Sequence, residues 1–175
     1  MTKRGEAAAT MAEIADAAGV SRQAVYLHFA DRADLMLELV RHADARLELD
    51  KELGAVWEAP DALSALRETV AAQARLNPKV WAVARALDAV RRTDKAAERG
   101  WQDRLQHRLE GARRLVARLQ KERKLRAGLD PEPAADLLWT LTSLRVWEDL
   151  VLERGWSARQ YERHVGSLVV RALTE

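Results

Sequence analysis

The stretch TMAEIADAAGVSRQAVYLHFADRADL, residues 10–35, carries the signals for two short helices joined by a tight turn. Thr10 and Glu13 have the spacing of a capping box, which predicts that a helix begins here. Gly19 can adopt the left-handed backbone conformation that ends a helix, and Ser21 is a favourable N-cap for the next one. The pattern therefore predicts a helix-turn-helix, a motif whose second helix presents its first side chains to the major groove of DNA.

Helical signals continue through the rest of the chain, and strand signals are missing. A composition rich in Ala, Leu, Arg and Glu and poor in Phe, Tyr and Ile is typical of helices. Apolar residues at helical spacing, set between capping and breaking residues, predict helices from Asp31 to about Leu53, Pro60 to Asn77, Pro78 onward, Asp94 to Leu119, Asp130 to Gly155, and Ser157 to the C-terminus. The predicted fold class is all-α with about eight or nine helices. We divide it into an N-terminal helix-turn-helix domain, residues 1–53, and a C-terminal helical domain, residues 54–175.

Length and composition limit the class of protein further. The chain has 175 residues, which is enough to bury a core without a disulfide or a structural metal. It has no cysteine, so disulfide frameworks and thiolate zinc sites are excluded. No apolar run approaches the roughly 20 residues that span a bilayer, and the first ten residues do not resemble a secretory signal. We therefore expect a soluble, cytoplasmic protein with no membrane partner.

The spacing of residues 9–35 resembles that of the bacterial tetracycline-repressor (TetR) family. The matching positions are Ala9-Thr10, Ile14-Ala15, Ala18-Gly19-Val20-Ser21, Tyr26, His28-Phe29, Arg32 and Leu35. The segment 150–161, which contains Gly155-Trp156-Ser157, is similar to the C-terminal helix pair of several members. The resemblance implies a ligand-responsive transcriptional repressor, a cytoplasmic bacterial homodimer that binds double-stranded operator DNA and a small-molecule effector.

The resemblance also implies which side chains contact DNA. Arg22, Gln23 and Ala24 would face base edges, where arginine suits guanine, glutamine suits adenine and alanine suits the thymine methyl group. A second set would hold phosphates, which fixes the register on the duplex without reading its sequence. This second set comprises Thr10, Ser21, Tyr26, His28 and Arg32. The alternative is a capped helical corner in which Tyr26 and Phe29 are ordinary core aromatics.

One departure from the family pattern concerns the N-terminus. The family places a full amphipathic helix before this motif to cover Ile14, Val25 and Phe29, and residues 1–9 cannot supply it. Because an uncovered apolar face is unstable on a small domain, we infer that roughly 20 to 30 native N-terminal residues are missing. The alternative is a natural variant with impaired DNA binding.

The last two predicted helices offer more apolar surface than a small monomer can cover. We expect them to pair with their symmetry mates in a four-helix interface, which would set two recognition helices about 34 to 36 Å apart and require a palindromic operator. The expected interface residues are Trp147, Leu150, Val165, Leu168, Val169 and Ala172. Each of them could instead belong to the core of its own subunit.

Tryptophans and polar residues are mixed on the helices that family members use to enclose a ligand. The expected pocket residues are Gln73, Trp81, Arg85, Trp101, Leu105, Trp139 and Thr142. A mostly apolar cavity with few polar groups suits a flat or lipophilic effector, and Arg85 could pair with an anionic one. The alternative is that the tryptophans fill a solid core.

An enzyme is not expected, because the chain has no phosphate-binding glycine loop, no cysteine nucleophile and no Ser/His pair in a recognisable turn. Asp103, His107 and Glu110 share a helix face, but they lie among arginines, so an exposed ion-pair face is favoured over a metal site. We expect no metal and no cofactor. The alternative function is a helical ligand-binding dimer with impaired or lost DNA binding.

Overall fold

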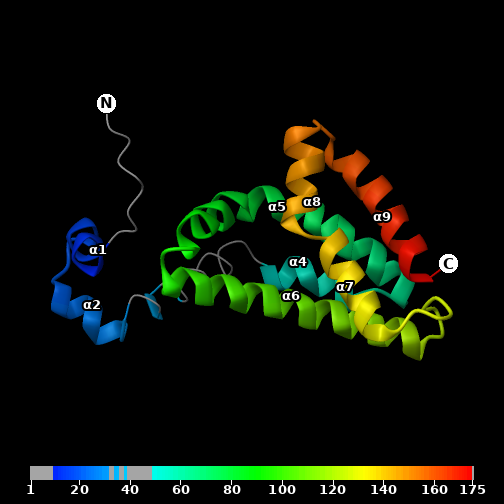
Figure 1. Ribbon diagram of the computed structural model, residues 1–175, viewed down its shortest axis with the longest axis horizontal. Coiled ribbons are helices and arrows are strands. Elements are labelled where there is room, and N and C mark those ends of the chain that lie inside the picture. Colours follow the sequence, from blue (N-terminus) through cyan, green and yellow to red (C-terminus); the bar gives the residue numbers. More distant parts are fainter. Residues whose placement is uncertain (1–9, 32–33, 36–37, 39–48, 175) are drawn as a thin grey trace. The chain divides into compact units, whose positions relative to one another are not determined.

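The computed structural model describes residues 10–31, 34–35, 38 and 49–174, and every regular element in this part of the chain is helical, which confirms the predicted all-α class (Figure 1). The helices are α1 Met11–Ala18, α2 Arg22–His28, α4 Leu49–Glu58, α5 Ala62–Arg91, α6 Lys95–Lys121, α7 Pro131–Leu141, α8 Leu144–Trp147, the π-helix η1 Glu148–Glu153, and α9 Ala158–Thr174.

Predicted helix starts are confirmed where a side chain caps the backbone a few residues ahead. The Asp94 carboxylate accepts hydrogen bonds from the backbone N–H groups of Ala96 and Ala97, at 2.8 and 3.2 Å, at the start of α6. Ser157 accepts from the Gln160 N–H at 3.2 Å, and the Gln160 side chain accepts from the Ser157 N–H at 2.9 Å before α9. Such bonds satisfy the N–H groups that the first turn of a helix leaves unpaired.

Two predicted helix ends are wrong. Helix α5 continues through Asn77 and Pro78, and α4 continues through Gly54. Proline removes one helical hydrogen bond and glycine is unfavourable in a helix, so other interactions must outweigh both costs. Around Pro78, Leu76 and Asn77 are only 5% and 3% exposed, which indicates that packing holds this part of α5 in helical form.

The prediction of a single helix from Asp130 to Gly155 is also wrong, because the structure divides this segment into α7, α8 and η1. Helix α7 ends at Leu141, and the Ser143 hydroxyl accepts a hydrogen bond from the Val146 N–H at 3.3 Å to start α8. The apolar residues that suggested one continuous helix therefore lie on three consecutive elements.

The chain forms two compact units. One contains residues 47–81 and 105–175, and the other contains residues 1–46 and 82–104. Fully buried side chains of α5, α6, α7 and α9 form the core of the first unit, and the largest are Leu66, Leu115, Leu119, Leu138, Tyr161 and Leu173. The predicted domain boundary after residue 53 stays a prediction.

Polar bonds fasten the start of α5 to the end of α6 within the first unit. The Glu122 carboxylate accepts from the Ala62 N–H at 2.8 Å and from the Arg118 guanidinium at 3.0 Å. Arg118 also donates to the Ala59 carbonyl at 2.7 Å. The Ala62 bond holds the pKa of Glu122 below its ordinary value of 4.5 and the Arg118 bond adds to this, so the carboxylate is the form that the fold stabilises.

Candidate nucleic-acid interface

Helix α1 begins at the predicted capping box. The Thr10 hydroxyl accepts from the Glu13 N–H at 3.2 Å, and the Glu13 carboxylate accepts from the Thr10 N–H at 2.7 Å. The Thr10 hydroxyl also donates to Glu13 at 2.9 Å. These bonds hold the pKa of Glu13 below its ordinary value of 4.5, with the backbone bond as the largest cause. Thr10 is exposed, but its hydroxyl already serves the helix start.

The turn between α1 and α2 depends on Gly19. Its φ of 67° lies in the left-handed region, where glycine carries no steric penalty. The Gly19 N–H donates to the Asp16 carbonyl at 3.2 Å, and the Val20 N–H donates to the Ala15 carbonyl at 3.1 Å. These two bonds satisfy carbonyls at the end of α1 and direct the chain into α2.

A small apolar cluster holds the two helices together. Met11 and Ala15 of α1 and Val25 of α2 are buried, and Phe29 and Leu35 pack against them. Ser21 caps α2 by accepting from the Ala24 N–H at 3.0 Å. Val25 is the only buried residue of α2, and five of its seven residues are exposed.

The outer face of α2 gathers the side chains predicted to meet DNA. Arg22, Gln23, Tyr26 and His28 are exposed, and Ala24 is half-buried. The Arg22 guanidinium lies 5.7 Å from the centre of the Tyr26 ring, a distance suited to a cation–π contact. Tyr26 is 45% exposed and so is not a core aromatic, which removes that alternative for this residue.

Two further points concern the predicted DNA contacts. Leu27 is 81% exposed and lies one helical turn from Gln23, although it is not among the predicted DNA contacts. A leucine at this place in an amphipathic pattern suggests a core residue, and only its exposure shows that it belongs to the outer face. Arg32 lies outside the described residues.

The predicted effector residues are spread over both units. Arg85 and Trp101 belong to the unit with residues 82–104, and the other five belong to the unit with residues 47–81 and 105–175. Leu105 and Trp139 are in contact, because the Trp139 indole N–H donates to the Leu105 carbonyl at 3.3 Å. The pocket as a whole stays a prediction.

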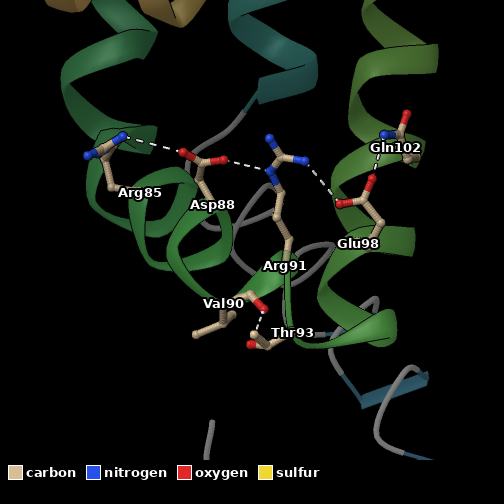
Figure 2. Close-up of polar contacts among 7 residues, drawn as sticks. All are labelled: Arg85, Asp88, Val90, Arg91, Thr93, Glu98 and Gln102. Atoms are coloured by element: carbon tan, nitrogen blue, oxygen red, sulfur yellow. Dashed lines mark hydrogen bonds and ion pairs between the residues drawn. The ribbon is translucent and has the colours of Figure 1, made fainter. Parts of the chain in front are cut away.

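Several of these side chains already have partners in the chain. Arg85 lies 3.4 Å from Asp88, which also pairs with Arg91 at 2.6 Å, and Arg91 reaches Glu98 at 3.1 Å (Figure 2). The same Arg91 guanidinium lies 4.9 Å from the centre of the Trp101 ring. These contacts fasten the end of α5 to the start of α6.

In the other unit, the Trp81 indole N–H donates to Glu148 at 2.7 Å, and the Thr142 hydroxyl donates to the Leu138 carbonyl at 2.7 Å. Thr142 is 5% exposed and Gln73 is half-buried. The indole and hydroxyl protons of Trp81 and Thr142 would therefore have to change partners to bind an effector.

The predicted interface residues divide into two sets. Trp147, Val165 and Val169 are buried within this chain alone, at 3%, 3% and 0% exposure. Leu168 is 44% exposed, and Leu150 and Ala172 are half-buried. The second set is the part of this surface that a second copy could reach directly, and the interface stays a prediction.

Neither a metal site nor a membrane-spanning helix is found among the described residues. No group of three or more His, Asp or Glu side chains in that part of the chain could hold a metal ion. No helix among the same residues is long and apolar enough to cross a membrane.

Comparison with known proteins gives a family match and a set of structural neighbours. Residues 1–39 match the sequence model described as "Bacterial regulatory proteins, tetR family". A search of curated proteins gave no significant match.

Solved structures share the fold over most of the chain. A transcriptional regulator from Saccharomonospora viridis in complex with choline has a TM-score of 0.69 at 20% identity, covering 94% of this chain and 86% of that one. A TetR-family transcriptional regulator from Rhodococcus sp. has a TM-score of 0.66 at 18% identity, covering 95% and 88%. The ketosteroid transcriptional regulator KstR2 of Mycobacterium tuberculosis has a TM-score of 0.58 at 19% identity, covering 99% and 88%. The matched family and these neighbours are transcriptional regulators rather than enzymes.

Proposed function

Because residues 1–39 match the tetR family of bacterial regulatory proteins and the chain has the fold of its regulators, we propose that it is a ligand-responsive transcriptional repressor that binds a palindromic operator as a homodimer. The observation that supports this most directly is the outer face of α2, where four polar or aromatic side chains predicted to meet DNA are exposed together. Such a regulator acts on chromosomal DNA and therefore in the bacterial cytoplasm.

In this proposal α2 lies in the major groove. Arg22 and Gln23 read base edges through paired hydrogen bonds, while Ala24 and Leu27 contact thymine methyl groups. Ser21, Tyr26 and His28 hold phosphates on either side. The Ser21 oxygen accepts from the Ala24 N–H, which leaves its hydroxyl proton to donate to a phosphate.

DNA binding is tested with duplexes selected from a random library by the chain itself. Arg22→Ala and Gln23→Ala should each weaken binding to the selected sequence by about 5- to 150-fold, because a good bidentate base contact contributes about 1 to 3 kcal/mol. Arg145→Ala is the matched control, since Arg145 lies on α8 and its side chain is 76% exposed. Thermal unfolding of each variant checks that the fold is intact.

The outcome also separates the two candidate functions. Enrichment of a palindrome, with affinity that falls steeply as salt rises, supports the repressor. If no sequence is enriched while the chain still forms a dimer in sedimentation experiments, the alternative of a ligand-binding dimer without DNA binding replaces it. If Arg145→Ala weakens binding as much as Arg22→Ala, the outer face of α2 is not the reading surface.

The effector is proposed only as a small molecule. The S. viridis neighbour was crystallised with choline, which supports a small-molecule ligand for this fold, and KstR2 is described as a ketosteroid transcriptional regulator. Coupling between effector and operator sites is typically about 1 to 3 kcal/mol, so a true effector should change operator affinity about 5- to 150-fold. A screen of compounds by tryptophan fluorescence identifies those that bind. Measuring operator affinity in the presence of each binding compound then tests the coupling. A compound that binds tightly without changing operator affinity is not the effector.

A further inference from the structure

A groove with a volume of about 780 Å³ lies between the first turns of α5 and the length of α9. Four arginines from the two helices line it: Arg67 from α5, and Arg159, Arg163 and Arg171 from α9. The other lining residues are Ser64, Glu68, Ala71, Glu162, Gly166, Ser167 and Val170. None of the predicted effector or interface residues lines this groove.

Small residues from both helices line the hollow, Ala71 of α5 and Gly166 of α9 among them. Gly166 is buried in the middle of α9, and a Cβ atom added to it would meet no atom within 4 Å. Glycine is unfavourable inside a helix relative to alanine, and no neighbouring atom in this chain requires it here. A larger side chain at Gly166 would therefore extend into unoccupied space beside the arginines.

The groove has an excess of positive charge. Within the part of the chain that the structure describes, the guanidinium groups of Arg67, Arg159, Arg163 and Arg171 form no hydrogen bond or ion pair. Of the two lining carboxylates, Glu68 pairs with Arg75 at 2.7 Å. Glu162 is therefore the only lining carboxylate without an ion pair among the described residues. By contrast, other arginines of α5 and α6, such as Arg91 and Arg113, form ion pairs with acidic side chains.

We propose that this groove binds a small, multiply charged anion that bears phosphoryl or carboxylate groups. The planar guanidinium group presents paired N–H donors that match the oxygen spacing of both groups. Helices distant in sequence contribute to the same hollow, so an anion held there would connect the start of α5 to α9. The site is independent of the proposed repressor function.

The test uses isothermal titration calorimetry of the full chain at low ionic strength. Pyrophosphate is the phosphoryl probe, citrate is the carboxylate probe and chloride is the control anion. Arg67→Gln and Arg163→Gln should each weaken binding of the preferred probe at least about threefold, because each removes one charged contact. Glu162→Gln should strengthen binding about twofold or more, since it removes the repelling carboxylate.

Two glycine substitutions form a matched pair. Gly166→Ala should preserve the fold, because no atom obstructs its methyl group, but should weaken binding by narrowing the hollow. Gly111→Ala makes the same change in α6, also with no atom within 4 Å, and lies outside the groove, so binding should not change. Arg145→Gln controls for the loss of one positive charge elsewhere.

Opposite effects of Arg163→Gln and Glu162→Gln, with unchanged binding in Gly111→Ala and Arg145→Gln, support the proposal. Absence of saturable binding by either probe overturns it, as does equal weakening in Arg163→Gln and Arg145→Gln. If no probe binds and Gly166→Ala dissociates a dimer in sedimentation experiments, a second copy of the chain occupies the groove and the anion site is rejected.

Discussion

Tyr161 carries a buried hydroxyl that costs the fold free energy. Its side chain is 0% exposed, and its Oη atom has no hydrogen-bond partner among the described residues. A buried donor without a partner costs about 1 to 3 kcal/mol, since it has lost its bonds to water. Tyr161→Phe removes the hydroxyl and keeps the ring, so the free energy of unfolding should rise by about 1 kcal/mol at neutral pH. For a chain of this length, that corresponds to a rise in Tm of roughly 2 to 4 °C.

Burial of Tyr161 also makes the free energy of unfolding depend on pH in the alkaline range. Burial raises the pKa of Tyr161 from 10.0 to about 12, and the Arg108 guanidinium opposes this only in part. Between these two values the unfolded chain loses the proton and the folded chain keeps it, so the free energy of unfolding does not depend on this group below pH 10.0 and falls as pH rises toward 12. The difference of about two pH units corresponds to at most about 3 kcal/mol.

Urea unfolding of wild type and Tyr161→Phe, at neutral pH and at a pH of about 11, measures both effects. Tyr26→Phe is the matched control. Tyr26 is the other tyrosine of the chain and is 45% exposed, so removing its hydroxyl group should not change the free energy of unfolding. In Tyr26→Phe only Tyr161 remains, and its tyrosinate absorbance should rise only near its raised pKa. A loss of 1 kcal/mol or more in Tyr161→Phe at neutral pH would show that the hydroxyl is bonded and would refute the reasoning.

Two further substitutions test single positions. Gly19→Ala places a Cβ atom at a φ of 67° and should lower the free energy of unfolding by about 1 kcal/mol, measured by urea unfolding, and an unchanged midpoint would mean that the turn can adopt another conformation. Glu122→Gln should weaken the attachment of Ala62 and Arg118 and lower the urea midpoint at neutral pH. Because the folded state lowers the pKa of Glu122, this contribution is present above its ordinary value of 4.5 and declines as pH falls through the lowered pKa, so wild type and variant should converge in acid, and parallel pH profiles would contradict it.

Helix starts could be predicted from the sequence because their determining bonds are local. The caps at Thr10, Ser21 and Ser157 each join residues three positions apart, so the residue types and their spacing are sufficient. The cap at Ser21 also places Arg22 and Gln23 in the first turn of α2, where the structure shows them exposed.

Helix ends were harder to predict because they depend on packing between distant segments. Pro78 lies inside α5, next to buried Leu76 and Asn77, and local rules alone place a helix end there. Leu27 shows the converse, because its residue type suggests a core position and only the fold shows 81% exposure. The arginine groove could not be predicted either, since residues 64–71 and 159–171 meet only in the folded chain.

The separation of buried and exposed positions on α2 bears on how the proposed function could change without loss of the fold. Val25 packs against Met11 and Ala15 of α1, whereas Arg22, Gln23 and Leu27 are exposed. Substitutions at exposed helix positions usually change stability by less than about 0.5 kcal/mol, whereas a bidentate base contact contributes about 1 to 3 kcal/mol. Substitutions at those three positions should therefore change the free energy of operator binding several-fold more than they change the free energy of unfolding. Single substitutions on this face could therefore change the preferred operator sequence step by step while the fold is kept.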